Sequence, residues 1–211
     1  MGLITHTDPQ GSEAWLASRR GVITGSRFKD CRDRLKGGAP SKKCTGYAMD
    51  VARERAGGTP MSVFEKAAMR FGSEQEPLAR AAYEMLTKNF VEEAGFITTE
   101  DRLFGVSVDG MVGDDGLIEI KTMVSSDTLF TAVVDGDISS YIDQCNGAMW
   151  LLRRKWIDLV LWAPDLEAIG RHLTIIRINR NDDEIDALES DLVDFERMVT
   201  RYENLLKKEA A

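Results

Sequence analysis

The chain has 211 residues, of which 43% are hydrophobic and 29% are charged, and its formal net charge at pH 7 is −8. This composition is typical of a folded globular protein, and it contains no run of 18 apolar residues that would indicate a membrane span. Three widely spaced cysteines and two histidines indicate neither a disulfide framework nor a zinc site, so we expect a reduced, cytoplasmic protein. Any metal ion should have oxygen ligands, which favours Mg²⁺ or Mn²⁺.

Charge is distributed unevenly along the chain. Between Leu16 and Lys43 nine basic residues accompany two acidic ones, a local charge of +7, and the remainder carries −15. A basic patch on an acidic body can attract an anion to one place while other surfaces repel it. The alternative is an ordinary solvated helix surface, because charge asymmetry alone is common.

Helical patterns occupy most of the first 90 residues. Ser12 is suited to an N-cap and Gly21 to a helix end, so the first helix is expected between them. Further helices are expected from about residues 24–26 onward, over 45–58 and over 62–86. Gly-Gly and Pro in residues 35–43 indicate a loop. Pro77 is expected to break or restart the long helix, because proline lacks an amide donor and clashes with the preceding turn.

The β signals begin near Val91. Short β-rich segments are expected over 95–99, 103–112 and 116–122, with a hairpin turn at 113–116. Two helices then follow, over 125–134 and 139–154. Two strands come next, over 156–164 and 171–179. The last element is an amphipathic helix over 181–209, whose acidic start suits the helix dipole.

This order predicts an α/β fold, a central mixed β-sheet flanked by helices. We expect a single domain over residues 1–211. Its parts are a helical N-terminal part (10–90), a core (91–180) and a C-terminal helix (181–208).

The hairpin "VSVDGMVGDDGLIEIKT" (106–122) carries charges where core residues are expected. Side chains alternate along a strand, so Glu119 and Lys121 share one face, and an antiparallel partner can bring Asp109 to within about 5 Å. Two close carboxylates repel each other unless a cation lies between them. A divalent metal removes that conflict and can bind a phosphate oxygen. The alternative is a solvent-facing polar strand with an incidental Glu–Lys pair.

Asp109 with Glu119-x-Lys121 resembles the core of the PD-(D/E)xK nuclease superfamily. The chain as a whole resembles the phage lambda-type alkaline exonuclease family of viral recombination nucleases. The segments that carry this resemblance are "AWLASRRGVITGS" (14–26), "FGSEQEPLARAAYE" (71–84), and "SVDGMVGDDGLIEIKT" (107–122) followed by residues 141–164. Val108 departs from the pattern, because the family usually has proline there.

The resemblance implies a restriction-endonuclease-like core and a 5′–3′ exonuclease. Such an enzyme degrades one strand of linear duplex DNA to mononucleotides with Mg²⁺, for which Mn²⁺ can substitute, and leaves a 3′ overhang for recombination by strand annealing. It implies Asp109, Glu119 and the backbone carbonyl of Ile120 as metal ligands. Glu76 would act through water or a second ion, and Lys121 would position or activate the attacking water.

The resemblance also implies a pocket for the 5′ phosphate of DNA. The residues that match this pocket are Arg19, Ser26, Ser107 and Gln144. Met69 matches an apolar wedge that separates the terminal base pair. Lys36, with Lys42 and Lys43 in the same predicted loop, is expected to contact DNA phosphates, which would make binding weaken with salt.

The implied partners are duplex DNA with 5′-phosphorylated ends, further copies in a homotrimer ring and a single-strand annealing protein, but no membrane. The implied location is the bacterial cytoplasm, with a phage or prophage origin. Two alternatives stay open: an endonuclease of restriction or repair type, and a non-enzymatic DNA-binding or scaffold protein.

Overall fold

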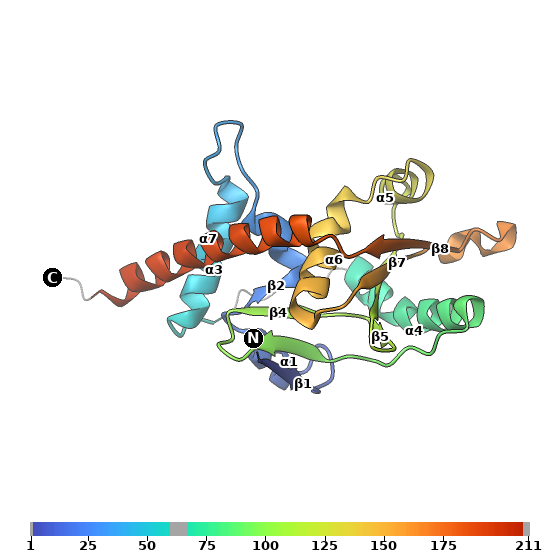
Figure 1. Ribbon diagram of the computed structural model, residues 1–211, viewed down its shortest axis with the longest axis horizontal. Coiled ribbons are helices and arrows are strands. Elements are labelled where there is room, and N and C mark those ends of the chain that lie inside the picture. Colours follow the sequence, from blue (N-terminus) through green and yellow to red (C-terminus); the bar gives the residue numbers. More distant parts are fainter. Residues whose placement is uncertain (1, 60–66, 209–211) are drawn as a thin grey trace.

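The computed structural model describes residues 2–59 and 67–208, except for the side chains of 67–69. Its described part contains two four-stranded sheets, ordered β1-β3-β4-β2 and β5-β6-β7-β8, with helices around them (Figure 1). The strands are β1 (Leu3–His6), β2 (Ile23–Thr24), β3 (Phe96–Thr99), β4 (Phe104–Ser107), β5 (Gly110–Val112), β6 (Gly116–Thr122), β7 (Trp156–Trp162) and β8 (Leu173–Asn179).

The helices have the following bounds, with η marking short 3₁₀ or π segments. They are α1 (Glu13–Arg19), η1 (Gly25–Arg27), α2 (Phe28–Cys31), α3 (Lys42–Arg55), α4 (Ala67–Thr87), α5 (Ser126–Leu129), η2 (Phe130–Val134), α6 (Ser139–Leu152), η3 (Pro164–Ile169) and α7 (Asp182–Lys207). The predicted fold class, mixed sheet flanked by helices, is confirmed, but the strands divide between two sheets.

The sheet β5-β6-β7-β8 is mixed and is covered on both faces. Strands β5 and β6 form an antiparallel hairpin, β6 and β7 are parallel, and β7 and β8 are antiparallel. Parallel strands need a crossover, and the segment with α5, η2 and α6 supplies it. Alternate residues of β6 face opposite sides, so Leu117 packs with Cys145 of α6. Ile118 and Ile120 pack with Tyr83 of α4.

The other sheet joins the N-terminal segment to the middle of the chain. Strand β3 pairs antiparallel with β1 and β4, and β2 runs parallel to β4. Beside it, α3 packs along α7, with Tyr47 and Phe195 stacked at a ring-centroid distance of 5.4 Å. Figure 1 shows α7 running past α3, with its C-terminal end on the opposite side of the picture from α4 and β5.

The segment 103–112, expected as one strand, divides between the two sheets. Strand β4 ends at Ser107 in one sheet and β5 begins at Gly110 in the other. At the break, the Asp109 amide donates to the Ile118 carbonyl at 3.2 Å. The Asp109 carboxylate accepts from the Ile120 amide at 2.6 Å. A side chain therefore satisfies a backbone donor of β6, and this leaves the main chain free to change sheets.

The expected break at Pro77 is wrong, because α4 continues through it. Pro77 is exposed, so its ring points away from the sheet. Contacts on either side hold the helix: Gln75 accepts from the Trp162 indole at 3.0 Å, and Tyr83 is fully buried. These tertiary contacts offset the local cost of the missing amide donor. The part of the expected helix at residues 62–66 lies outside the described residues.

Two N-terminal expectations need smaller corrections. The helix expected near residues 24–26 is a 3₁₀ turn followed by only four α-helical residues. The loop over 35–43 ends earlier than expected, because Ser41 accepts from the amides of Lys43 and Cys44 and caps α3. Lys42 and Lys43 therefore lie in the first turn of a helix. Strand β1 was not predicted from the sequence.

No helix of the described residues is long and apolar enough to cross a membrane.

Candidate active site

The β5–β6 hairpin is held in shape by glycines and by an arginine. Gly113 in its turn has φ +54°, which glycine adopts without strain. Gly116 lies against Trp156, where an added Cβ would meet the ring at 2.2 Å. Arg154, just after α6, donates to the Gly113 carbonyl at 3.0 Å. The turn expected from "GDDG" is therefore confirmed, and its position relative to α6 is fixed.

The hairpin brings Asp109 alongside β6, as its spacing predicted. The Asp109 carboxylate bonds the Ile120 amide. In an extended strand the amide and the carbonyl of one residue point to the same side. The Ile120 carbonyl therefore points to the side that carries Asp109, where the resemblance placed it as a ligand.

Glu119 and Lys121 share the face of β6 that α6 covers, also as predicted. The Lys121 ammonium donates to Glu119 Oε1 at 2.7 Å and to Gln144 Oε1 at 3.2 Å. The Gln144 amide donates to Glu119 Oε1 at 2.5 Å. Glu119 is 3% exposed, and its second oxygen, Oε2, is buried with no hydrogen-bond partner among the described residues.

Asp109, Glu119 and Glu76 carry more negative charge than Lys121 and Arg80 balance, because Arg80 is shared with Glu93. Burial raises the pKa of Asp109 well above its ordinary value, and the charges of Glu119 and Glu76 raise it further. Burial also raises the pKa of Glu76; Arg80 opposes this shift, whereas Glu119 adds to it. Burial alone would lower the pKa of Lys121, but the adjacent Glu119 carboxylate raises it, so the ammonium stays charged. Such a group of acids is stabilised by an added cation.

A cleft of about 280 Å³ adjoins this group. Glu76 of α4 and Asp109 line it together, and Arg80 pairs with Glu76 at 3.0 Å and with Glu93. The other lining residues come from the N-terminal segment and from the β3 and β4 region: Thr7, Asp8, Pro9, Gln10, Trp15, Ala94, Gly95, Ser107 and Val108. The cleft thus joins the acidic group to Ser107, a predicted phosphate contact.

The residues at the hairpin fit a divalent cation with oxygen ligands. Over residues 2–59 and 67–208, no group of three or more His, Cys, Asp or Glu side chains is arranged to hold a metal ion. The hairpin instead offers two carboxylates and a main-chain carbonyl, and Glu119 Oε2 is a buried acceptor in need of a partner. Hard oxygen ligands of this kind suit Mg²⁺, which usually keeps several waters.

A second cluster, at the predicted phosphate pocket, forms next to the cleft. Arg19 donates to Ser107 Oγ at 3.2 Å, and its guanidinium lies 4.4 Å from the Trp15 ring centroid. Strand β2 runs beside β4, and Gly25 packs against Val106, where an added Cβ would meet Cγ1 at 2.9 Å. This places the exposed Ser26 close to the end of β4. The helix after Ser26 has four residues, too few to supply a strong helix dipole to an anion.

The profile of the YqaJ-like viral recombinase domain matches residues 14–152. The chain belongs to this family. Its fold matches an alkaline exonuclease (LHK-Exo) from Laribacter hongkongensis at 31% identity and TM-score 0.81, over 93% of this chain and 96% of that one. LHK-Exo in complex with dAMP matches with the same values. The expected resemblance to lambda-type exonucleases is confirmed at this level.

A phage-related exonuclease from Haemophilus somnus 129PT has the same fold, at TM-score 0.68 and 18% identity over 88% of this chain and 95% of that one. No curated protein matches the sequence significantly.

The remaining predicted DNA contacts of this viral recombinase domain are dispersed. Gln144 contacts Glu119 and Lys121 rather than Arg19 or Ser107. Lys36 is exposed in the loop before α3, and Lys42 is exposed on that helix. Lys43 pairs with Asp30 at 2.6 Å. Met69 lies in α4, but its side chain is outside the described residues, so its role as a wedge stays a prediction.

Sequence reasoning missed two side chains that touch the predicted ones. Arg80 lies four residues after Glu76, a spacing that predicts an ion pair on one helix face, and the structure contains that pair. Tyr141 precedes Gln144 by one helical turn, and the Lys121 ammonium lies 5.9 Å from its ring centroid. The position of Arg80 relative to Glu76 could have indicated the ion pair, and the helical period of α6 could have placed Tyr141 beside Gln144.

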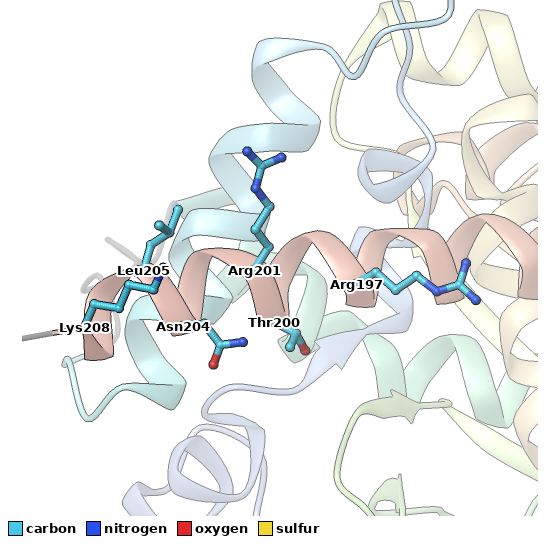
Figure 2. Close-up of a pocket in the computed structure, with 6 residues that line it drawn as sticks. All are labelled: Arg197, Thr200, Arg201, Asn204, Leu205 and Lys208. Carbon is cyan, nitrogen blue, oxygen red and sulfur yellow. The ribbon is translucent and has the colours of Figure 1, made fainter.

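A larger hollow lies elsewhere, at the C-terminal end of α7. This α7 groove of about 410 Å³ is lined by Arg197, Thr200, Arg201, Asn204, Leu205 and Lys208 (Figure 2). The picture shows Arg197 and Arg201 extending away from the α7 helix at different points along it rather than toward a common point. The groove contains none of the predicted site residues.

Proposed function

We propose that the chain is a Mg²⁺-dependent 5′–3′ exonuclease that degrades one strand of linear duplex DNA to mononucleotides. The product would be a 3′ overhang suited to recombination by strand annealing. One observation carries the proposal: Asp109, Glu119 and Lys121 converge on one edge of the hairpin, where Glu119 Oε2 is buried without a partner among the described residues.

The coarse activity rests on the family. The chain is a deoxyribonuclease, as its membership of the viral recombinase family and its 31% identity to an alkaline exonuclease support. The solved complex of that exonuclease with dAMP fits release of mononucleotides, because dAMP is a 5′ mononucleotide.

Asp109, Glu119 and the Ile120 carbonyl are the groups that would hold Mg²⁺, with Glu76 reaching it through water. Mn²⁺, which also accepts oxygen ligands, is expected to substitute. When bound, the ion would supply positive charge to the scissile phosphate and acidify a water molecule.

The chain's own side chains then orient the reactants. Glu119 Oε1 and Gln144 Oε1 together accept two of the three ammonium donors of Lys121. The third donor can hold the attacking water or the developing charge on a phosphate oxygen. Asp109 holds β6 in register through the Ile120 amide. Arg80 keeps Glu76 at the wall of the cleft.

The 5′–3′ direction would come from Arg19, Ser107 and Ser26. A guanidinium can bind a terminal phosphate through two hydrogen bonds, and Arg19 already donates to Ser107 Oγ. Because the cleft connects Ser107 with Asp109, a 5′ phosphate held at Arg19 would place a following phosphodiester near the carboxylates. Lys36 and Lys42 would add non-specific phosphate contacts.

We further propose that the enzyme acts in the cytoplasm of a bacterial host. It would work as a homotrimer ring beside a single-strand annealing protein. A ring with basic residues inside and acidic residues outside would reconcile the +7 segment with the net charge of −8. An enclosed strand could not diffuse away, which would make degradation processive.

The test is digestion of three substrates: linear duplex with a 5′ phosphate, the same duplex without it, and closed circular duplex. With Mg²⁺ we expect rapid release of mononucleotides from the 5′-phosphorylated ends, slower release from the dephosphorylated ends and no cut in the circle. EDTA and Asp109→Asn should both stop release. Nicking of the circle at a comparable rate would instead indicate an endonuclease. Turnover in EDTA would show that the reaction does not need a divalent metal ion.

A further inference from the structure

We propose that Tyr141 is a positioning residue, whose ring holds the Lys121 ammonium in the orientation that the chemical step needs. The inference rests on the proposed function, because it assigns a role relative to Lys121. It adds a residue of α6 that has no charge and that need not touch DNA.

The geometry comes from the helical period of α6. Residues three and four apart lie on one helix face, so Tyr141, Gln144 and Cys145 form a continuous surface over β6. Gln144 accepts from Lys121 at 3.2 Å, and the Tyr141 ring centroid lies 5.9 Å from the ammonium. Cys145 is fully buried. Burial raises the pKa of its thiol to about 12, and Glu119 adds to this shift, so this part of the surface is uncharged.

Lysine needs such support more than most side chains do. Its four-carbon stem has many rotamers, and ordering them costs conformational entropy. Hydrogen bonds to Glu119 and Gln144 fix two of the ammonium donors. The electron-rich face of a tyrosine attracts a cation within about 6 Å of its centroid. The ring therefore favours the same orientation without using the third donor, which stays available to water.

A cation–π contact depends on the electron density of the ring, whereas simple packing depends on its shape. Phenylalanine and its mono-, di- and trifluorinated forms keep nearly the same shape while fluorine withdraws density from the face. Placed at position 141, they separate the two roles. Tyr141→Phe is the reference of this series, because it retains the ring and removes the hydroxyl.

We expect kcat on 5′-phosphorylated linear duplex to fall stepwise with each fluorine. The total loss from phenylalanine to the trifluorinated form should be roughly three- to thirty-fold, and Tyr141→Leu should lose at least as much. KM and DNA binding in Ca²⁺ should stay constant. In a Lys121→Ala background the fluorine series should have no further effect, because the cation is absent. The matched control is the same series at Tyr202, which packs beside the α3–α7 core.

A flat fluorine series in an active enzyme would overturn the inference. A series that changes KM or DNA binding, with kcat constant, would also overturn it, because the ring would then contact the substrate. If the wild-type chain has no Mg²⁺-dependent exonuclease activity, the proposed function itself is wrong. That result is distinct from either outcome at Tyr141.

Discussion

Two hollows of the described structure, the α7 groove and the cleft at the hairpin, differ in size and in the burial of their charges. The α7 groove is the larger, at about 410 Å³, and its Arg197 side chain is 74% exposed and pairs with Asp194, whose side chain is 57% exposed. The cleft at the hairpin measures about 280 Å³, and the Glu119 beside it is 3% exposed. Charges in the groove are solvated, whereas those at the cleft are forced together.

Solvated and buried charges have different energetic consequences. Exposed ion pairs contribute at most about 1 kcal/mol, so the groove needs no functional reason for its composition. Burying more carboxylates than the neighbouring lysine and arginine can balance opposes folding unless a cation or a substrate compensates. Clusters of buried acids with raised pKa values are therefore candidate functional sites. The difference between the two regions supports the cleft at the hairpin as the proposed site of chemistry.

The largest expected effect is at the carboxylates and the lysine of the hairpin. Asp109→Ala and Lys121→Ala should each lower the rate of mononucleotide release by roughly 10³-fold or more, because each removes charge stabilisation worth several kcal/mol. Steady-state digestion of 5′-phosphorylated linear duplex measures this loss.

Binding of DNA should largely survive both changes, since contacts with other phosphates supply most of the affinity. Gel shifts in Ca²⁺ check that expectation. If Lys121→Ala keeps Mg²⁺-dependent turnover, the role given to the lysine is wrong.

Next in size is the effect of Arg19 on end recognition. Arg19→Ala should lower the preference for 5′-phosphorylated over dephosphorylated ends by about 10- to 100-fold, since a hydrogen bond to a charged group contributes about 1.5–3 kcal/mol. Paired digestions of the two duplexes measure the ratio. An unchanged preference would place the phosphate pocket elsewhere.

A stability measurement sharpens the same contrast between buried and exposed charge. In EDTA at pH 8, Asp109→Asn should raise Tm by roughly 2–6 °C, because it removes a buried like charge yet keeps an acceptor for the Ile120 amide. The raised pKa of Asp109 means that the native state binds its proton more tightly than the unfolded chain does. Wild-type stability therefore falls as pH rises above about 4, and the gain should shrink toward acid pH.

Differential scanning calorimetry at pH 8 and pH 5 tests this prediction. Arg197→Gln in the groove is the control, with a shift within about 1 °C. A lower Tm for Asp109→Asn in EDTA would mean that the carboxylate stabilises the metal-free fold.

The smallest expected effect is at the α7 groove. Arg197→Gln and Arg201→Gln should each change exonuclease turnover by less than about two-fold, because these side chains are solvated and lie away from the hairpin. The substrates and conditions are those used for Asp109→Ala. A loss above ten-fold would give the groove a part in catalysis that its exposed charges do not indicate.

Local patterns were sufficient for the hairpin and for the long helix α7. Period-two alternation placed Glu119 and Lys121 on one face, and the Asp-rich turn returned the chain beside Asp109. The break between β4 and β5 was not predictable, because the side chain of Asp109, which lies between the two strands, replaces a backbone partner of β6. Pro77 misled for a similar reason, since distant contacts of Gln75 and Tyr83 hold α4 together.

Side-chain contacts between α6 and β6 depend on tertiary packing that no spacing specifies. The resemblance placed Gln144 at the 5′ phosphate, whereas its amide contacts Glu119 and Lys121. Tyr141 carries no charge or motif that would single it out, and only the packing of α6 on the sheet brings its ring to Lys121.

The central claim is that the negative charge of Glu119, which would hold the divalent ion and the Lys121 ammonium, is needed for the chemical step. Glu119→Gln tests this claim most directly, because it removes the charge and keeps the shape of the side chain. Single-turnover release of the 5′-terminal nucleotide, with the variant saturated by duplex in Mg²⁺, should slow by roughly 10³-fold or more. DNA binding in Ca²⁺ should be unchanged. A rate within about ten-fold of wild type would contradict the account and move the reaction away from the hairpin.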